Sequence, residues 1–438
     1  MTTAAKRSQT TMTTEVSEVG AKGIAAREAA RALARFSTEV KNQALLAIAR
    51  DLLEHEPYIL TANREDIEAA RAAGLTNAVQ DRLFLSHERL EAIADDVRQV
   101  SLLPDPVGEM IDMRTLPNGL RVGRRRVPLG VIAAIYESRP NVTVDIASLC
   151  LKSGNACILR GGKEAIHSNT ALASIVHEAI SSAGVPQDAV QLIENTDRAL
   201  LGEMLRMKDA IDLVVPRGGP ELISYVAENA TMPVLTGGTG VCHTYVDRAA
   251  DTDKAVRVVH NAKTRKVSIC NALDTVLVHQ DVAEPFLPEL GRHWSEAGVE
   301  MRCDEPSFRI LNTAEIPELN LKHAGPDDFG HEFLALTAAV KVVGSLDEAL
   351  GHIQRYGTGH SDAIITEDYS AAMRFVDEVD TAVVYVNAST QFTDGAQFGL
   401  GAEIIDSTQK TIARGPVGLR EITTYKWIVL GDGQTRPS

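Results

Sequence analysis

The clearest indication of the fold lies in residues 131–159, which read VIAAIYESRPNVTVDIASLCLKSGNACIL. Two short apolar runs, Val131–Tyr136 and Ala156–Leu159, flank a segment whose pattern predicts a helix through Thr143–Lys152. Short continuous apolar strands that alternate with amphipathic helices are typical of βαβ units, whose parallel sheet is buried on both faces. The stretch therefore predicts an α/β protein with a parallel sheet.

The same alternation continues towards the carboxyl end, whereas residues from about 20 to 100 carry helical apolar stripes instead. Further strands are predicted at residues 189–193, 211–215, 275–278, 338–343, 362–366 and 382–387. A turn signal at Pro117–Gly119 predicts a hairpin, and the β-like run that ends residues 413–431 is expected to pair with it. We therefore expect two α/β domains and a small β element.

Composition excludes several classes of protein. The chain has 438 residues, 44% hydrophobic and 24% charged, and a net charge of −15, which argues against nucleic-acid or acidic-membrane partners. No apolar run approaches the roughly 18 residues of a membrane span, and the first residues lack the apolar core of a signal peptide. Five cysteines without CxxC spacing fit free thiols in a reducing cytoplasm.

Cys270 lies in the loop KTRKVSICNALDT, residues 263–275, which looks like a reactive-thiol loop. Lys263, Arg265 and Lys266 precede it, with no acid before Asp274, and nearby positive charge lowers a thiol pKa. The alternative is that a free cysteine between two apolar elements is a small core residue. Other cysteines and histidines (Cys242, His243, His260) lack metal-ligand spacing, so no metal site is predicted.

Three loops follow predicted strands of the first series, where open parallel sheets bind ligands. They are ESRPNVT (137–143), RGGKE (160–164) and PRGGPE (216–221). Both Gly-Gly pairs precede helices, so their backbone N–H groups can approach an anion such as a dinucleotide phosphate; tight turns explain them equally well. Arg160 and Lys163 favour a cofactor with a 2′-phosphate, although both side chains also fit a solvated loop.

Five blocks of the chain carry a family resemblance, in this order: residues 136–169, VPRGG (215–219), NAKTRKVSICNALDT (261–275), RYGTGHSDAIITED (355–368) and VNASTQFTDGAQFGLGAE (386–403). Over about residues 20–430 the chain resembles the gamma-glutamyl phosphate reductases, a family of the aldehyde dehydrogenase superfamily. The resemblance implies an aldehyde-dehydrogenase-like α/β fold with a Rossmann-like cofactor domain, an α/β catalytic domain and a small β oligomerisation element. It implies NADPH-dependent reduction of L-glutamyl 5-phosphate to L-glutamate 5-semialdehyde and phosphate through a cysteine thioester, the second step of proline biosynthesis from glutamate.

The resemblance also implies roles for particular residues. Cys270 matches the nucleophile, and Asn141 matches the asparagine that holds the oxyanion together with the Cys270 backbone N–H. The residues implied to bind NADPH or NADP are Arg160, Gly161, Gly162, Lys163, Pro216, Arg217, Gly218, Gly219 and Glu332. Those implied to contact the substrate are Arg139, Asn387, Ser389 and Thr390. Two runs depart from the family pattern: Arg265–Val267, where a proline is usual, and Ile404–Asp406, where a glycine is usual.

With the resemblance, the predicted organisation is a disordered tail (1–18), an NADPH-binding domain (19–113 and 127–252), a catalytic domain (253–408) and an oligomerisation hairpin and tail (114–126 and 409–438). A cytoplasmic homo-oligomer is expected, with the glutamate 5-kinase that supplies the labile acyl phosphate as a candidate partner.

Three alternatives remain: a hydrolytic aldehyde dehydrogenase, a CoA-acylating one, and a non-catalytic nucleotide-binding protein in which Cys270 is only core. Hydrolysis needs a carboxylate base, yet Leu235 stands about where that glutamate is expected and residues 231–246 contain no acid.

Overall fold

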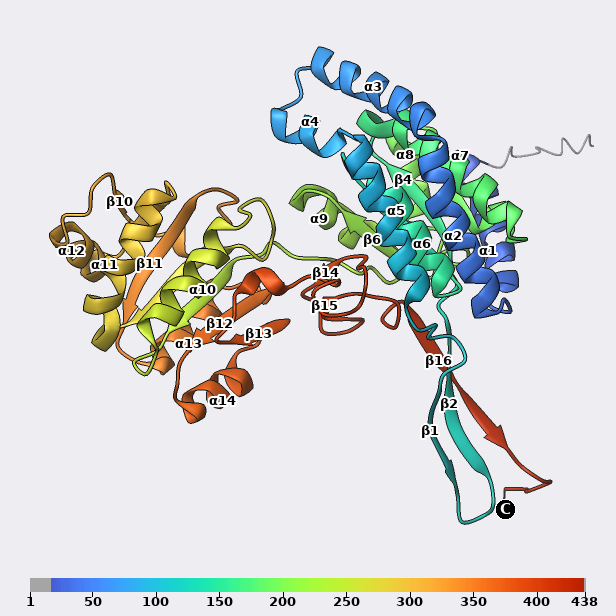
Figure 1. Ribbon diagram of the computed structural model, residues 1–438. Coiled ribbons are helices and arrows are strands. Elements are labelled where there is room, and N and C mark those ends of the chain that lie inside the picture. Colours follow the sequence, from blue (N-terminus) through green and yellow to red (C-terminus); the bar gives the residue numbers. More distant parts are fainter. Residues whose placement is uncertain (1–16, 437–438) are drawn as a thin grey trace, which may run out of the picture.

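Two α/β lobes and a projecting β arm make up the computed structural model, which describes residues 17–436 (Figure 1). Its helices are α1 (Glu18–Leu33), α2 (Thr38–Glu54), α3 (Glu56–Ala72), α4 (Asn77–Leu83), α5 (His87–Leu102), α6 (Asn141–Lys152), α7 (Ile166–Ser182), α8 (Arg198–Met204), α9 (Pro220–Asn229), α10 (Thr252–Thr264), α11 (Gln280–Glu296), α12 (Glu305–Thr313), α13 (Leu346–Tyr356) and α14 (Tyr369–Glu378).

The first lobe is built on a parallel sheet of four strands in the order β5-β4-β3-β6. These strands are β3 (Val131–Tyr136), β4 (Ala156–Gly161), β5 (Val190–Leu192) and β6 (Leu213–Arg217). All six residues of β3 are buried because helices pack against the sheet, which explains why the strand reads as an unbroken apolar run. The helices α2, α5, α6 and α7 pack on one another in this lobe.

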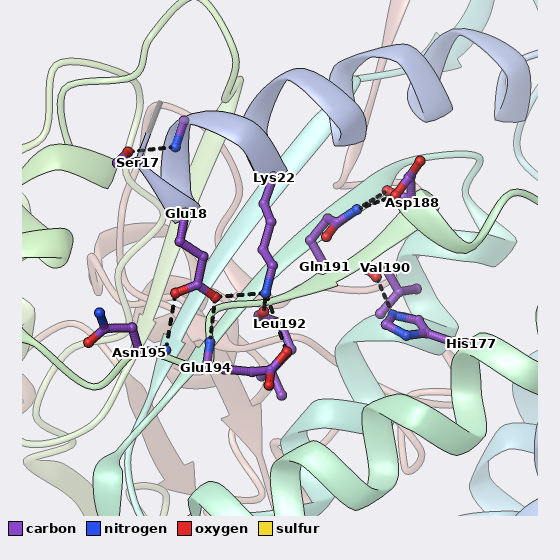
Figure 2. A network of polar contacts seen from close by, with 11 residues as sticks. Ser17, Glu18, Lys22, His177, Asp188, Val190, Gln191, Leu192, Glu194 and Asn195 are labelled. Atoms are coloured by element: carbon purple, nitrogen blue, oxygen red, sulfur yellow. Dashed lines mark hydrogen bonds and ion pairs between the residues drawn. The ribbon is translucent and has the colours of Figure 1, made fainter. Parts of the chain in front are cut away.

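A polar network fastens α1 to the segment that follows β5 (Figure 2). The Glu18 carboxylate accepts the backbone N–H groups of Glu194 and Asn195, at 2.9 and 3.2 Å, while Lys22 donates to the carbonyl of Leu192. Ser17 caps the helix, because its Oγ accepts the N–H of Gly20. Residues 1–16 of the predicted disordered tail lie outside the described residues, whereas Ser17 caps α1 and Glu18 begins it.

The second lobe contains a parallel sheet of seven strands in the order β10-β9-β11-β8-β7-β12-β13. Its strands are β7 (Cys242–Val246), β8 (Leu273–His279), β9 (Glu300–Cys303), β10 (Asn320–His323), β11 (Thr337–Val343), β12 (Ser361–Ile365) and β13 (Val383–Val386). Strand β8 leaves the Cys270 loop near the centre of this sheet, and its seven residues are buried. The Cys270 loop is thus anchored at both sides, by the carboxyl end of α10 and by the start of β8.

The β arm is a three-stranded antiparallel sheet in the order β1-β2-β16. Its strands are β1 (Met110–Thr115), β2 (Arg121–Pro128) and β16 (Thr423–Leu430). Pairing of β16 with β2 runs from Thr423 opposite Pro128 to Leu430 opposite Arg121, which confirms that the tail pairs with the hairpin. A further short pair, β14 (Asp406–Ser407) and β15 (Gly415–Pro416), lies between the lobes and the arm in Figure 1.

The α/β fold class predicted from the sequence is confirmed, with parallel sheets in both lobes. The predicted domain limits stay a prediction. Within residues 17–436, none of the helices combines the length and the apolar character that crossing a bilayer requires.

Candidate active site

Cys270 opens onto a cavity of about 690 Å³ that residues from both lobes line. The lining residues from the first lobe include Arg82, Glu137, Ser138, Arg139, Lys163, Glu164 and Pro216–Gly219. Those from the rest of the chain include Gly237–Thr239, Ser268–Asn271, Glu332, Thr393, Asp394, Glu403, Ile405 and Asp406. The described cysteines are all free, and Cys270 is half-buried whereas the other four are buried.

One side of the cavity, here called the basic wall, carries Arg82, Arg139, Lys163 and Arg217. Arg139, Lys163 and Arg217 lie at the carboxyl ends of β3, β4 and β6, which are neighbours in the sheet, so that these positions converge; Arg82 belongs to α4. The two acids on this side are engaged by the loops themselves. Glu137 Oε2 accepts the N–H of Gly219 at 3.1 Å, and Glu164 Oε1 accepts the N–H of Ser138 at 2.8 Å.

The acidic lining residues, here called the acidic wall, are Glu332, Asp394, Glu403 and Asp406. Glu332 Oε1 accepts the N–H of Gly240 at 3.0 Å, and Glu403 Oε2 accepts the N–H of Gly395 at 2.7 Å. Arg217 joins the two walls, because its Nη1 donates to the carbonyl oxygen of Ile404. Glu332 is distant in sequence from the other three acids, which lie within residues 394–406.

Gly240 fixes the position of the Cys270 main chain. A Cβ built at Gly240 would lie 1.7 Å from the carbonyl oxygen of Cys270, so a side chain there is incompatible with this backbone arrangement. The Cys270 carbonyl also accepts the thiol of Cys242 at 3.3 Å. The thiol-bearing residue is therefore held from behind by β7 and the loop that leads into it.

The expected low pKa of Cys270 is wrong in this structure. Burial, followed by the negative charges of Asp406, Glu332 and Glu403, raises the pKa of the Cys270 thiol to about 12, and Arg217 opposes that rise. Two of the three basic residues that precede the cysteine are directed elsewhere. Lys263 is buried and donates to the carbonyl of Leu273 at 2.8 Å, while Arg265 donates to the Gln391 side chain at 3.1 Å.

Burial also perturbs the carboxyl groups of the acidic wall. It raises the pKa of Glu332 and of Glu403. The pKa of Asp406 rises to about 8, through burial first and then through the negative charge of neighbouring Glu403. Asp406 Oδ1 is buried and has no hydrogen-bond partner among the described residues. Two adjacent carboxyl groups of this kind favour a shared proton.

His360 approaches the thiol from the start of β12. A nitrogen of its ring, the Cys270 Sγ and a carboxylate oxygen of Asp406 all lie within 4.8 Å of one another. Its Nδ1 is 2.9 Å from Ser361 Oγ, which is 2.7 Å from Thr393 Oγ1. Burial lowers the pKa of His360 to about 4, so the ring is neutral at pH 7.

The other predicted site residues divide into two groups. Arg139, Lys163, Pro216–Gly219 and Glu332 line the cavity with Cys270. Asn141 is the first residue of α6, and its Nδ2 donates to Asp145 at 2.8 Å. Arg160 donates instead to the carbonyl groups of Thr196 and Asp197, at 3.5 and 3.1 Å.

Three of the four residues predicted to contact the substrate serve the local backbone. Asn387 exchanges two hydrogen bonds with the main chain of Thr366, Ser389 caps the short helical turn Thr390–Phe392, and Thr390 donates to the carbonyl of Asn271. Their neighbours Thr393 and Asp394 line the cavity in their place. The roles of all these residues stay predictions.

Sequence reasoning missed His360, Glu403 and Asp406. His360 and Glu403 do fall within the blocks RYGTGHSDAIITED and VNASTQFTDGAQFGLGAE, and Asp406 falls in a run noted as a departure from the family pattern. Those blocks could have drawn attention to His360 and Glu403. Their distance from Cys270 in the sequence, however, gives no indication that the three residues lie near the thiol.

Known proteins place the chain in a family. A model described as the aldehyde dehydrogenase family matches residues 5–308. A gamma-glutamyl phosphate reductase of Dehalococcoides mccartyi is 58% identical over 96% of this chain and 98% of the relative. One of Roseiflexus castenholzii is 53% identical over 97% of this chain and 100% of the relative. This chain belongs to the aldehyde dehydrogenase family, among the gamma-glutamyl phosphate reductases.

A solved structure agrees with that assignment. The gamma-glutamyl phosphate reductase of Thermotoga maritima superposes with a TM-score of 0.92 at 48% identity, over 96% of this chain and 100% of that chain. The lobes and the arm described above are therefore those of an aldehyde dehydrogenase family member. The sequence resemblance to the gamma-glutamyl phosphate reductases is confirmed.

Proposed function

We propose that the chain reduces L-glutamyl 5-phosphate with NADPH to L-glutamate 5-semialdehyde and phosphate, through a thioester on Cys270, as the second step of proline biosynthesis. The observation that carries the proposal is the position of Cys270 in a cavity with one basic and one acidic wall. The substrate carries both an anionic phosphoryl group and an ammonium group. The basic wall suits the first and the acidic wall suits the second.

The residues present fit a dinucleotide cofactor. A Cβ at Gly219 would meet no atom within 4 Å, so this glycine leaves open space where α9 begins. Space beside a helix N-terminus suits a pyrophosphate. Lys163 lines the same cavity and is the candidate contact for a 2′-phosphate, and Glu332 lines it near the thiol. When bound, NADPH supplies the hydride that reduces the thioester.

The protein's own groups act on the acyl carbon. The Cys270 sulfur forms the S–C bond as the C–O bond to phosphate breaks, and the thiol proton leaves with the phosphate. The Asn141 amide donates one N–H to Asp145, and we propose that its second N–H joins the Cys270 N–H in holding the oxyanion. After reduction the C–S bond breaks, and the sulfur regains a proton.

The hydrolytic alternative depends on a base, and the acidic wall supplies carboxyl groups that residues 231–246 lack. Asp406 is mostly protonated at pH 7, because burial raises its pKa to about 8, so little of it is in the form that can accept a proton from water. Phosphate arrives as an anion and needs no deprotonation. We therefore expect oxidation of glutamate 5-semialdehyde with NADP to depend on inorganic phosphate.

The test is a stopped-flow and steady-state assay of NADPH formation at pH 7. Without phosphate, formation should stop near one turnover per active site, and added phosphate should restore it. Sustained turnover to glutamate without phosphate contradicts the proposal in favour of hydrolysis, and replacement of phosphate by coenzyme A favours the CoA-acylating alternative. Cys270→Ser, which has no adjacent base in this loop, should abolish turnover while NADPH still binds.

The β arm suggests how the chain assembles. Tyr425, Trp427 and Val429 alternate along β16 and are 47%, 58% and 55% exposed. We propose that this face joins a cytoplasmic homo-oligomer, and that the kinase that makes the labile acyl phosphate works beside it. Sedimentation of the chain with and without Trp427→Glu tests the first point, because a charge there should dissociate the oligomer.

A further inference from the structure

The group formed by Cys270, His360 and Asp406 has a chemistry that the proposed reduction does not use. Among residues 17–436 it is the one set of three sulfur, nitrogen or carboxylate donors whose atoms lie within 4.8 Å of one another. The three residues come from separate segments: the loop before β8, the start of β12 and β14. This is why no metal-ligand spacing is visible in the sequence.

Two donor atoms of this group lack partners. His360 is 2% exposed, and its Nε2 has no hydrogen-bond partner among the described residues. The same holds for Asp406 Oδ1. A buried polar atom without a hydrogen-bond partner destabilises the folded protein. A bound ligand that contacts these two atoms would remove that cost. His360 Nδ1 is engaged by Ser361 Oγ at 2.9 Å, the arrangement that orients a histidine ligand from behind.

We infer that Cys270, His360 and Asp406 bind Zn²⁺ reversibly and that the bound ion inhibits the enzyme. Sulfur, imidazole and carboxylate are the three ligand types of zinc, whereas Mg²⁺ and Ca²⁺ require oxygen ligands. Three protein ligands leave the fourth tetrahedral position to water. Ligand atoms around tetrahedral zinc lie about 3.4–3.6 Å apart, so small side-chain rotations close the present group onto the ion.

The surroundings support a cation at this place. Glu332 and Glu403 stand on the same wall, and both act on the Cys270 thiol as negative charges. Coordination replaces the thiol proton with the metal, which releases that proton to solvent and removes the sulfur lone pair from attack on an acyl group. Inhibition should therefore be reversed by a chelator and prevented by a pre-formed thioester.

Binding is measured on the full chain with Zn²⁺ by titration calorimetry, and with Co²⁺ by the thiolate-to-cobalt absorption band. We expect one ion per chain, protection of Cys270 from iodoacetamide, and displacement of Co²⁺ by Zn²⁺. Mg²⁺ at the same concentration should do none of these. Reductase activity should fall in proportion to occupancy and return with chelator.

Variants identify the ligands. Cys270→Ala should abolish the cobalt band, and His360→Gln or Asp406→Asn should weaken binding at least tenfold. Cys303→Ala is the matched control, since Cys303 is a buried free cysteine on β9 that does not line the cavity. Binding that survives Cys270→Ala, or is lost in Cys303→Ala, overturns the inference. The inference is also overturned if zinc does not protect Cys270 of the unaltered protein from alkylation. This test does not depend on the folding of any variant.

Discussion

The basic and acidic walls of the cavity arise from the chain in different ways. The basic wall follows from sheet topology, because Arg139, Lys163 and Arg217 stand at or just after the ends of three neighbouring parallel strands. The acidic wall combines Glu332 with Asp394, Glu403 and Asp406, which lie within residues 394–406, distant from Glu332 in the sequence. A wall of the first kind is predictable from the order of strands, whereas one of the second kind depends on tertiary contacts.

The two walls also differ in how their charges are balanced. Glu137 and Glu164 on the basic side each accept a backbone N–H group of a neighbouring loop, that of Gly219 and that of Ser138. On the acidic side, burial raises the pKa of Glu332, Glu403 and Asp406, and Arg217 is the basic group that opposes the rise for Glu403 and Asp406. Arg217 is thus the residue on which both walls depend.

The largest expected effect comes from Arg217→Ala. It removes the charge that lowers the pKa of Cys270 and the hydrogen bond to the Ile404 carbonyl. A hydrogen bond to a charged group is worth about 1.5–3 kcal/mol, so kcat/KM should fall about ten- to hundredfold. The pH dependence of Cys270 alkylation should move to higher pH.

Arg217→Lys is the matched control, because it keeps the charge but not the planar donor. It should retain the alkylation profile while it loses part of the activity. An unchanged alkylation profile in Arg217→Ala contradicts the view that this side chain links the walls.

Lys163→Glu tests the basic wall alone. It places a negative charge where we propose the cofactor 2′-phosphate, so NADPH should bind more weakly by roughly 1.5–3 kcal/mol while NADH changes far less. Fluorescence titration with both cofactors measures the difference, and Lys163→Gln separates loss of attraction from added repulsion. Equal weakening of NADPH and NADH means that Lys163 does not read the 2′-phosphate.

The basic wall and the acidic wall also differ in how far the sequence predicts them. The apolar run Val131–Tyr136 and the two Gly-Gly turns predict the sheet and the loops at its edge, because local pattern and strand order determine them. The surroundings of Cys270 were not predictable in this way. Lys263 precedes Cys270 by seven positions but turns into the core towards Leu273, while Asp406 lies 136 positions away and reaches the thiol.

The next prediction concerns the free energy of unfolding and tests the acidic wall alone, through Asp406→Asn. The pKa of Asp406 is about 8 in the folded protein against an ordinary 3.8, so the folded state keeps a proton that the unfolded chain has lost. Its contribution to stability is complete below about pH 4 and is lost as the pH rises to about 8. Asp406→Asn cannot ionise, and its free energy of unfolding relative to the unaltered protein should improve from pH 5 to pH 8 by about 1–3 kcal/mol.

Urea unfolding at the two pH values measures this gain. Asp394→Asn serves as the control on the same wall, because the Asp394 carboxylate accepts the backbone N–H groups of Ala396 and Gln397 at 2.9 and 3.1 Å. It should show no comparable gain at high pH. A gain for Asp406→Asn that is identical at pH 5 and pH 8 contradicts an unpaired, proton-holding carboxyl group at this place.

The smallest expected effect comes from Arg160→Ala, which contrasts two identical Arg-Gly-Gly triplets at residues 160–162 and 217–219. Both follow strands of one sheet, and the sequence assigns both to the cofactor. Arg217 lines the cavity, whereas the Arg160 guanidinium donates to the carbonyl groups of Thr196 and Asp197 at the surface. Surface contacts of this kind are worth within about 0.5 kcal/mol, so the NADPH dissociation constant should change by about twofold or less. A tenfold weakening of NADPH in Arg160→Ala, with NADH unchanged, means instead that this arginine swings into the cavity and joins Lys163 on the 2′-phosphate. In that case the basic wall includes Arg160, at the end of β4, once the cofactor is bound.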